Sequence, residues 1–450
     1  MKSKLSIFNF QYSNIPKLEI GDWQLEIFPI VWRLAILTLP LQTRWFSEAS
    51  LANWPWEQGR LSFYVSWFFI LATILLARKI KLSKNLPQEK FWKFFIPLIL
   101  LFLSTLIGAR FEADALRAVL QWWLQVSLLA LFVYSLVHSG VSKKQVAMWF
   151  VISLLPHAAL GLRQFVSQQV IGSAWLGIAA QNPQNLGVSV IEAGGLRILR
   201  SYGNFPHPNI FGGWLAVGYL VTLWLAGSAK KPLGTITWSI ISAVFAAACI
   251  FSFSRTAWLA VVIGAAIFLF FSIRQKISHG RKFGNWKGVF LALLLSFITI
   301  GAIVIPERNL FFSRFNGNAR LEAKSMQERA TSLQLGLVLF RRHLFFGTGP
   351  NAELYDLAKL LPQKISDAPL ESPHNVFLLA LINFGIIGFL SSVWIFCLCR
   401  RFVIRHSSFV IPLVVLALFD HYLWSYWSGQ TLSAIGFLLV FLDDEPNGEA

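Results

Sequence analysis

The sequence carries little charge and very little cysteine for its length. Only 13% of its 450 residues are charged, and its three cysteines, Cys249, Cys397 and Cys399, lie within apolar runs. Soluble chains carry about a quarter charged residues, so an ordinary soluble enzyme, a disordered chain and a coiled coil are excluded. Three cysteines without metal-ligand spacing also exclude a disulfide scaffold and a cysteine metal centre.

Apolar residues dominate instead. The hydrophobic fraction is 56% and the mean hydropathy is +0.59, which is typical of a polytopic membrane protein. A membrane helix needs roughly 20 mostly apolar residues, and continuous rather than alternating runs favour helices over strands. We therefore expect an all-α membrane protein with about twelve transmembrane helices. The expected spans are 27–43, 60–77, 91–109, 118–137, 146–165, 208–227, 234–251, 256–273, 287–305, 374–399, 407–420 and 429–442.

The net charge of +18 is largely explained by the loops between these spans. If the N-terminus is cytoplasmic, every short connection on that side contains Lys or Arg, as the positive-inside rule requires. The charge thus indicates orientation and not nucleic-acid binding. We expect a cytoplasmic segment at 1–26, a transmembrane domain at 27–442 and a cytoplasmic acidic tail at 443–450.

The long segments fall on the opposite side, at about 166–207 and 306–373. Long loops commonly carry function. The first ends in Arg200-Ser-Tyr-Gly-Asn-Phe-Pro-His-Pro-Asn209, where the prolines fix an extended approach and Asn209 is expected to cap a helix. Arg200, His207 and Asn209 are candidate substrate-binding residues, and a capped helix entrance remains the alternative interpretation.

Arg255 lies in the tight turn Ser252-Phe-Ser-Arg-Thr-Ala-Trp258 between two spans that contain no Asp or Glu. An arginine at the membrane boundary usually has an anionic partner or a wet cavity. An external anion is therefore a candidate partner, with simple snorkelling to the surface as the alternative.

The long loop at 306–373 contains further arginines, including Arg320 and Arg329. The spacing predicts a helix from Arg320 to about Phe345, and its apolar face should lie along or pack onto the membrane domain. That face comprises Ala330, Leu333, Leu337 and Phe340. The following Gly347-Thr-Gly349 is read as a turn that ends the helix, because alone it is weak evidence for a phosphate site.

Two further segments bear ionisable groups at the same boundary. His374 and Asn375 open the tenth span, where a helix N-terminus should keep the imidazole neutral and able to accept a proton. Asp420 ends the eleventh span beside His421, and we expect it to pair with an arginine or with that histidine. A capping or packing role is the alternative for each.

These segments share one side of the membrane and one chemical character. Arginine forks suit phosphate oxygens, and a histidine is available as a base. The sequence has no ligand spacing typical of a metal site, so arginine would provide the charge neutralisation that a divalent ion often provides. This combination favours group transfer from a phosphate-bearing lipid.

The ordered motifs resemble the O-antigen ligase/O-antigen polymerase family of bacterial membrane glycosyltransferases. The resemblance covers about 195–395 and the topology extends it along the chain. The motifs are Arg200-x-x-Gly-x-Phe-x-His-Pro-Asn209, Ser254-Arg-x-x-Trp258, Arg329 with Gly347-x-Gly-x-Asn351, and His374-Asn375-x-x-Leu378 with Gly385 and Gly388.

The resemblance implies a GT-C-like helical fold in the bacterial inner membrane with a large periplasmic loop at 306–373. It implies an undecaprenyl-diphosphate-linked glycan donor and transfer at the periplasmic face, without a metal or other cofactor. By similarity, Arg255 and Arg329 (or Arg320 in place of Arg329) would hold the diphosphate. His374 would activate or orient the acceptor hydroxyl, and Arg200 would assist.

The acceptor stays open between lipid A-core, a second lipid-linked glycan and a protein hydroxyl. A competing hypothesis is a transporter or flippase of lipid-linked saccharides, which would also place arginines around a cavity between helices. It predicts mid-membrane basic residues and interrupted helices in paired halves, a pattern that the sequence does not display.

Overall fold

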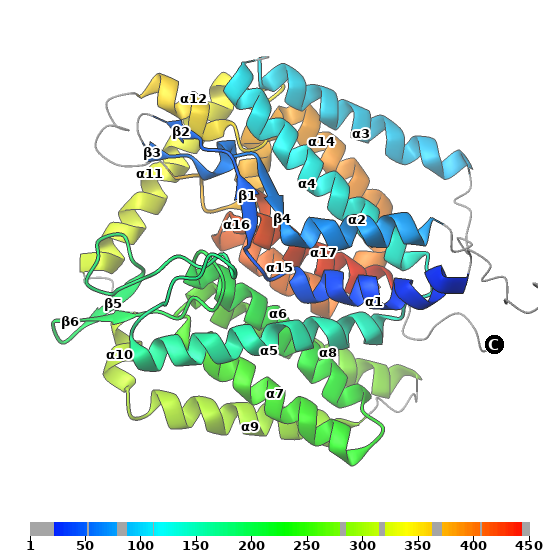
Figure 1. The fold of residues 1–450 in the computed structure, drawn as a ribbon, viewed down its shortest axis with the longest axis vertical. Coiled ribbons are helices and arrows are strands. Elements are labelled where there is room, and N and C mark those ends of the chain that lie inside the picture. Colours follow the sequence, from blue (N-terminus) through cyan, green and yellow to red (C-terminus); the bar gives the residue numbers. More distant parts are fainter. Residues whose placement is uncertain are drawn as a thin grey trace, which may run out of the picture.

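The computed structural model describes residues 22–51, 54–78, 88–110, 112–279, 285–314, 320–361, 371–405 and 407–442. Every expected span corresponds to a helix (Figure 1). These helices are α1 (Asp22–Thr38), α2 (Val65–Ala77), α3 (Gln88–Gly108), α4 (Ala113–Val137), α5 (Lys143–Ser167), α6 (Pro208–Ser228), α7 (Pro232–Phe251), α8 (Arg255–His279), α9 (Trp286–Val304), α14 (Val376–Arg405), α15 (Ser407–Phe419) and α17 (Trp427–Phe441).

Seven of the described helices are long and apolar enough to cross a membrane: α4 to α9 and α14. Shorter apolar helices lie within α2, α3, α15 and α17. The chain is therefore a mostly helical polytopic membrane protein, and the count of twelve spans stays a prediction. Residues 1–21 of the expected N-terminal segment at 1–26, and the whole expected tail at 443–450, lie outside the described residues.

Helix α6 forms the centre of the bundle and packs against α5, α7, α8, α9 and α15. Its sequence is apolar on all sides, which is typical of a fully surrounded helix, and Trp214 and Phe211 are completely buried. Gly213 brings its backbone against the Tyr422 hydroxyl, where a Cβ would clash. This contact fixes the start of α6 beside the segment that follows α15.

The mostly helical structure agrees with the expected all-α fold, and within the described residues the connections between helices add three short antiparallel pairs. They share one side of the molecule with the remaining short helices, and we call this side the loop face (left in Figure 1). Its strand pairs are β1 (Arg44–Phe46) with β4 (Ser62–Tyr64), β2 (Ser50–Leu51) with β3 (Trp54–Pro55), and β5 (Val190–Ala193) with β6 (Leu196–Leu199). Its helices are η1 (Glu57–Gly59), α10 (Arg308–Ser313), α11 (Arg320–Arg342), α12 (Glu353–Leu360) and α16 (Tyr422–Ser425).

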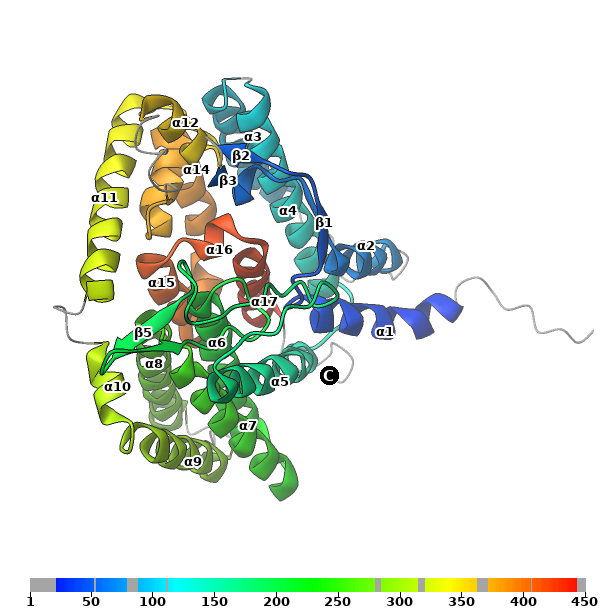
Figure 2. The same ribbon diagram turned by 60° about the vertical axis from the view of Figure 1, so that its left-hand side comes forward.

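Helix α11 confirms the predicted loop helix, and it runs along the loop face crosswise to α1 and α5 (Figure 2). Of the expected apolar face, Phe340 packs against the core cluster that contains Leu339, whereas Leu333 and Leu337 are 46% and 42% exposed. The buried side contains Ser332, Gly336 and Leu339 instead. Small residues there allow α11 to approach α14 closely, and this contact outweighs the burial of larger apolar side chains.

The predicted turn after α11 docks into a break in α14. Gly385 has φ 63° and ψ −171°, a conformation essentially restricted to glycine. The break frees backbone groups that pair with the turn, since Thr348 N donates to Ile382 O and Gly349 N to Asn383 O, both at 2.9 Å. The Gly347-Thr-Gly349 motif is therefore a structural turn that joins the loop face to α14.

We predict that Gly385→Ala destabilises the protein by at least ~2 kcal/mol, because alanine cannot adopt this conformation without strain. Its Cβ would also lie 2.4 Å from the carbonyl carbon of Phe345. Thermal melting in detergent measures the effect. Gly301→Ala in α9 is the control, because its Cβ would meet only Ile305 Cδ1 at 3.9 Å. Equal melting midpoints for the two variants would contradict the prediction.

Candidate active site

Two cavities meet at the loop face and share one wall. The larger, about 470 Å³, lies between β5–β6, the start of α8 and α11, and we call it the cationic cavity. The smaller, about 290 Å³, lies between β3, η1 and α16, and we call it the aromatic cavity. Both are lined by His207, Asn209, Glu371 and His374. The wall between the two cavities is therefore formed by three predicted site residues, His207, Asn209 and His374, together with Glu371.

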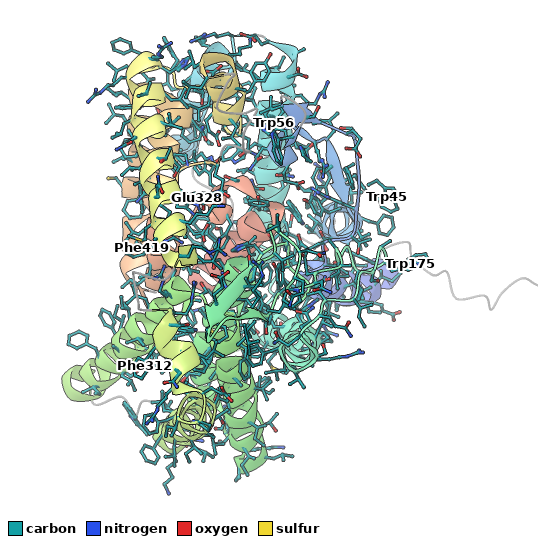
Figure 3. The ribbon with its side chains drawn as sticks, turned by 90° about the vertical axis from the view of Figure 1, so that its left-hand side faces the viewer. Trp45, Trp56, Trp175, Phe312, Glu328 and Phe419 are labelled. Atoms are coloured by element: carbon teal, nitrogen blue, oxygen red, sulfur yellow. The ribbon has the colours of Figure 1, made fainter. Side chains whose placement is uncertain are left out.

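Basic side chains dominate the cationic cavity, whose only acids among the described lining residues are Glu328 and Glu371. Figure 3 looks onto the loop face and labels Glu328 on α11. The N-terminus of α8 adds its partial positive charge where Ser254 to Thr256 line the space. Such a cavity favours a polyanion. Its basic residues are Arg197, Arg200, Arg255, Arg314, Arg320, Lys324 and Arg329.

Backbone carbonyl groups hold several of these guanidinium groups in place. Arg255 Nη1 donates to Arg314 O at 3.1 Å, and Arg314 Nη2 donates to Phe253 O at 3.0 Å. Arg200 is 7% exposed, so it does not snorkel to the surface, and its Nε donates to Ser252 O at 2.8 Å. A carbonyl orients a guanidinium without removing its charge, so these contacts preorganise the cavity for an anion.

The two candidate loop arginines differ in their surroundings. Arg320 is 70% exposed in its side chain and donates to Glu192 Oε1 at 2.6 Å. Arg329, nine residues further along α11, is half-buried in the cavity wall and is among the charges that act on His374. This difference favours Arg329 as the anion-binding residue.

A chain of polar contacts runs from the cationic cavity to His374. Arg200 Nη2 donates to Asn209 Oδ1 at 2.6 Å, and Asn209 Nδ2 donates to Asp420 Oδ2 at 2.9 Å. The other oxygen, Asp420 Oδ1, accepts from His421 N at 2.8 Å and lies 3.6 Å from His374 Nδ1. On the far side of the ring, His374 Nε2 is 3.3 Å from Glu371 Oε2.

The expectation that His374 is neutral is wrong for the free site. Burial disfavours the charged ring, but the carboxylates of Asp420 and Glu371 outweigh it and raise the pKa of His374 to about 9. Burial also acts to raise the pKa of Asp420, yet the facing His374 holds that pKa well below its usual range. His374 and Asp420 therefore form an ion pair at neutral pH. These carboxylates override the expected helix-terminus effect. His374 also lies outside the first turn of α14, because Asn375 is the residue that caps the helix through Leu378 N.

The caps at α6 also differ from expectation. His207, and not Asn209, is the N-cap, and its Nδ1 accepts from Asn209 N at 3.1 Å. Burial, together with the nearby Arg200, lowers the pKa of His207 to about 3, so the ring stays neutral. His207 is thus a structural cap in the shared wall, and the Asn209 side chain is available to join Arg200 to Asp420.

Asn375 and Glu353 fix the segment that carries His374. Asn375 Nδ2 donates to Leu418 O at 3.1 Å, which ties the start of α14 to the end of α15. Glu353 is completely buried and accepts from Ser372 Oγ at 2.7 Å and from Asn383 Nδ2 at 2.9 Å. No sequence pattern indicated Glu353, whereas Glu371 could have been found from its position three residues before His374.

His374, Asp420 and His421 are close enough to share a metal ion, since one ligand atom from each lies within 4.8 Å of the others. Their existing contacts account for the clustering in another way. Asp420 is already hydrogen bonded through both oxygens, and His421 Nδ1 lies 3.1 Å from Ser425 Oγ. The expected absence of a metal stays a prediction.

Comparison with known families places this site in context. Residues 240–393 match the family model described as O-antigen ligase, which confirms the resemblance drawn from the motifs. The match runs from α7 into α14 and includes Arg255, Arg320, Arg329, His374 and Asn375. A search of curated proteins found no match to the chain.

We predict that Asp420→Asn lowers the pKa of His374 from about 9, because the larger of the two favourable carboxylate interactions is lost while burial remains. Histidine-labelled NMR titration in detergent measures this shift. Glu371→Gln is the graded control and should lower the pKa less, since Glu371 is exposed. An unchanged His374 titration in Asp420→Asn would refute the ion pair.

Proposed function

We propose that this protein is a metal-independent membrane glycosyltransferase of the O-antigen ligase/polymerase type. It transfers or polymerises glycan from an undecaprenyl-diphosphate-linked donor at the periplasmic face, in O-antigen or other surface polysaccharide assembly. One observation carries the proposal: the cationic cavity ends at His374, beyond which a second cavity begins. The family match over residues 240–393 supports it.

The donor diphosphate would occupy the cationic cavity. Arg255 and Arg329 would bind its oxygens, because planar guanidinium groups form paired hydrogen bonds with phosphate. The charge on the departing diphosphate grows as the glycosidic bond breaks, so preorganised cations stabilise the transition state more than the bound donor. Arg200 would act less directly, because its contact with Asn209 places it in the chain that leads to Asp420.

His374 would act on the acceptor hydroxyl. As the hydroxyl oxygen bonds to the anomeric carbon, the bond from that carbon to the diphosphate oxygen breaks and the hydroxyl proton passes to His374 Nε2. Asp420 faces Nδ1, where it orients the ring and stabilises the imidazolium that forms. Glu371 lies at Nε2 and would yield its place to the acceptor hydroxyl.

Glu371 is a second candidate base because its carboxylate lies at the same ring nitrogen. In that case His374 would remain a cation throughout and would bind the diphosphate or orient the acceptor. The two roles predict opposite pH dependence above neutral pH, so they are experimentally separable.

We predict that kcat/KM rises with pH and levels off near 9, because a base must be unprotonated and the neighbouring carboxylates raise the pKa of His374 to about 9. Transfer from a defined lipid-diphosphate glycan, assayed in EDTA, gives the profile and tests metal independence together. His374→Ala should abolish this ionisation and most of the transfer.

A rate that is level between pH 6 and 8 and falls above about pH 9 would instead assign the base to Glu371. Loss of activity in EDTA, with recovery on adding a divalent ion, would contradict metal independence. In cells, His374→Ala should leave lipid-linked donor outside the membrane, whereas accumulation inside would favour a flippase.

We predict that Arg255→Lys raises the donor KM by about tenfold to a hundredfold, since lysine keeps the charge but loses the paired hydrogen bonds. Steady-state kinetics at fixed acceptor concentration measure this effect. Arg341→Lys at the exposed end of α11 makes the same change away from both cavities and should have no effect. Full donor affinity in Arg255→Lys would contradict the proposed phosphate contact.

A further inference from the structure

The lining residues of the aromatic cavity are not those expected to bind the donor diphosphate. The described residues around the aromatic cavity include no lysine or arginine. Its charged members are the acids Glu57, Glu371 and Asp420 and the His374 cation of the shared wall. A phosphate group would be repelled by these carboxylates, and the cation among the described lining residues, His374, already faces Asp420 and Glu371. The aromatic cavity therefore suits a neutral ligand, in contrast to its neighbour.

We propose that the aromatic cavity binds an uncharged sugar ring at the reacting end of the acceptor glycan, and that Leu51 and the residues from Trp54 to Gln58 build its outer wall. The inference rests on the proposed function for the direction of transfer. It adds the acceptor class and a binding site formed by residues outside the matched range 240–393.

Both aromatic and polar side chains line the aromatic cavity. Sugar rings present flat apolar C–H faces edged by hydroxyl groups, so their sites combine aromatic faces with a few fixed polar groups. Trp54, Trp56 and Tyr426 provide the rings, and Glu57 and Gln58 provide hydrogen-bonding groups. This composition matches a sugar better than a lipid chain, which needs no polar groups.

The surrounding contacts hold these side chains rigidly. Arg44 binds both oxygens of Glu57 through Nη1 and Nη2, at 2.5 and 2.9 Å. Trp56 is buried and stacks on Tyr355 of α12 with an interplanar angle of 19°. Gln121 of α4 donates to Ser62 O at 2.9 Å and anchors the segment that carries this wall to the membrane helices. A wall fixed in this way loses little conformational entropy on binding a ligand.

The wall shared by the two cavities indicates that the sugar in the aromatic cavity belongs to the acceptor glycan. In a direct displacement the nucleophile approaches the anomeric carbon from the side opposite the leaving group. With the diphosphate in the cationic cavity, the attacking hydroxyl would come from the aromatic cavity, and His374 lies between the two. The same sugar chemistry could belong to the donor glycan, so the experiment must separate donor from acceptor.

Trp54 offers the cleanest variant, since it lines the cavity rim and is 37% exposed, so its truncation spares the core. Trp54→Ala should raise the acceptor KM about three- to tenfold, the range expected for one aromatic contact, and leave the donor KM unchanged. Trp54→Phe should restore most of the affinity. Trp45→Ala is the matched control, because Trp45 is 67% exposed on β1 and lines neither cavity (Figure 3).

Binding to the full-length protein in detergent separates this inference from the proposed function. The probes are a phosphate-free oligosaccharide cut from the host's own surface polysaccharide and inorganic pyrophosphate. Trp54→Ala should weaken binding of the oligosaccharide and leave binding of pyrophosphate unchanged. Arg255→Lys should weaken binding of pyrophosphate and leave binding of the oligosaccharide unchanged. If this pattern holds without any transfer activity, the sugar site stands and the proposed function fails.

Three outcomes would overturn the sugar site. The first is unchanged oligosaccharide binding and acceptor KM in Trp54→Ala. The second is a raised donor KM with an unchanged acceptor KM, which would assign the cavity to the donor glycan. The third is displacement of the oligosaccharide by pyrophosphate, which would place both ligands in one space.

Discussion

The buried carboxylate of Asp420 is the constraint on which the candidate site depends. The residue is 5% exposed, and a buried charge is costly unless it is paired and hydrogen bonded. Its oxygens accept from Asn209 Nδ2 and His421 N and face His374. Asn209 belongs to α6, His421 is the N-cap of α16, and His374 lies in the segment before α14. Satisfying one carboxylate therefore brings three parts of the chain together.

The same requirement sets the character of the two cavities. Asn209 can satisfy Asp420 only while its amide oxygen takes the Arg200 hydrogen bond, so the orientation of a buried arginine is coupled to the carboxylate. His374 is held as a cation at the point where the cationic and aromatic cavities meet. Positive charge is thus concentrated on one side of the wall, and a space without lysine or arginine among its described lining residues lies on the other.

The sequence predicted the helices well because each apolar run is long, and burial in a membrane depends on local composition. Predictions from the sequence were wrong where residues far apart in the chain determine a property, such as the charge of His374. Burial lowers the pKa of His374, and the carboxylate that does most to raise it is Asp420, 46 residues away; no periodicity reveals such a pair. Pro208 at the first position of α6 was an available signal that His207 is the cap. The strands near Trp54 are too short to predict from pattern alone, since tertiary contacts fix them.

The match to a known family covers His374 and the basic residues that α8, Arg314 and α11 contribute to the cationic cavity, but neither Arg197 and Arg200 nor the outer wall of the aromatic cavity. In the proposed function this division has a physical reason. Every donor carries the same diphosphate, so the residues that bind it face one unchanging charge pattern. Acceptors differ in their sugars, and a wall built by Leu51 and the residues from Trp54 to Gln58 can vary without disturbing the cationic-cavity arginines or the Asp420 contacts. Transfer chemistry and acceptor choice would then reside in separate segments of one chain, joined only at the wall that carries His374.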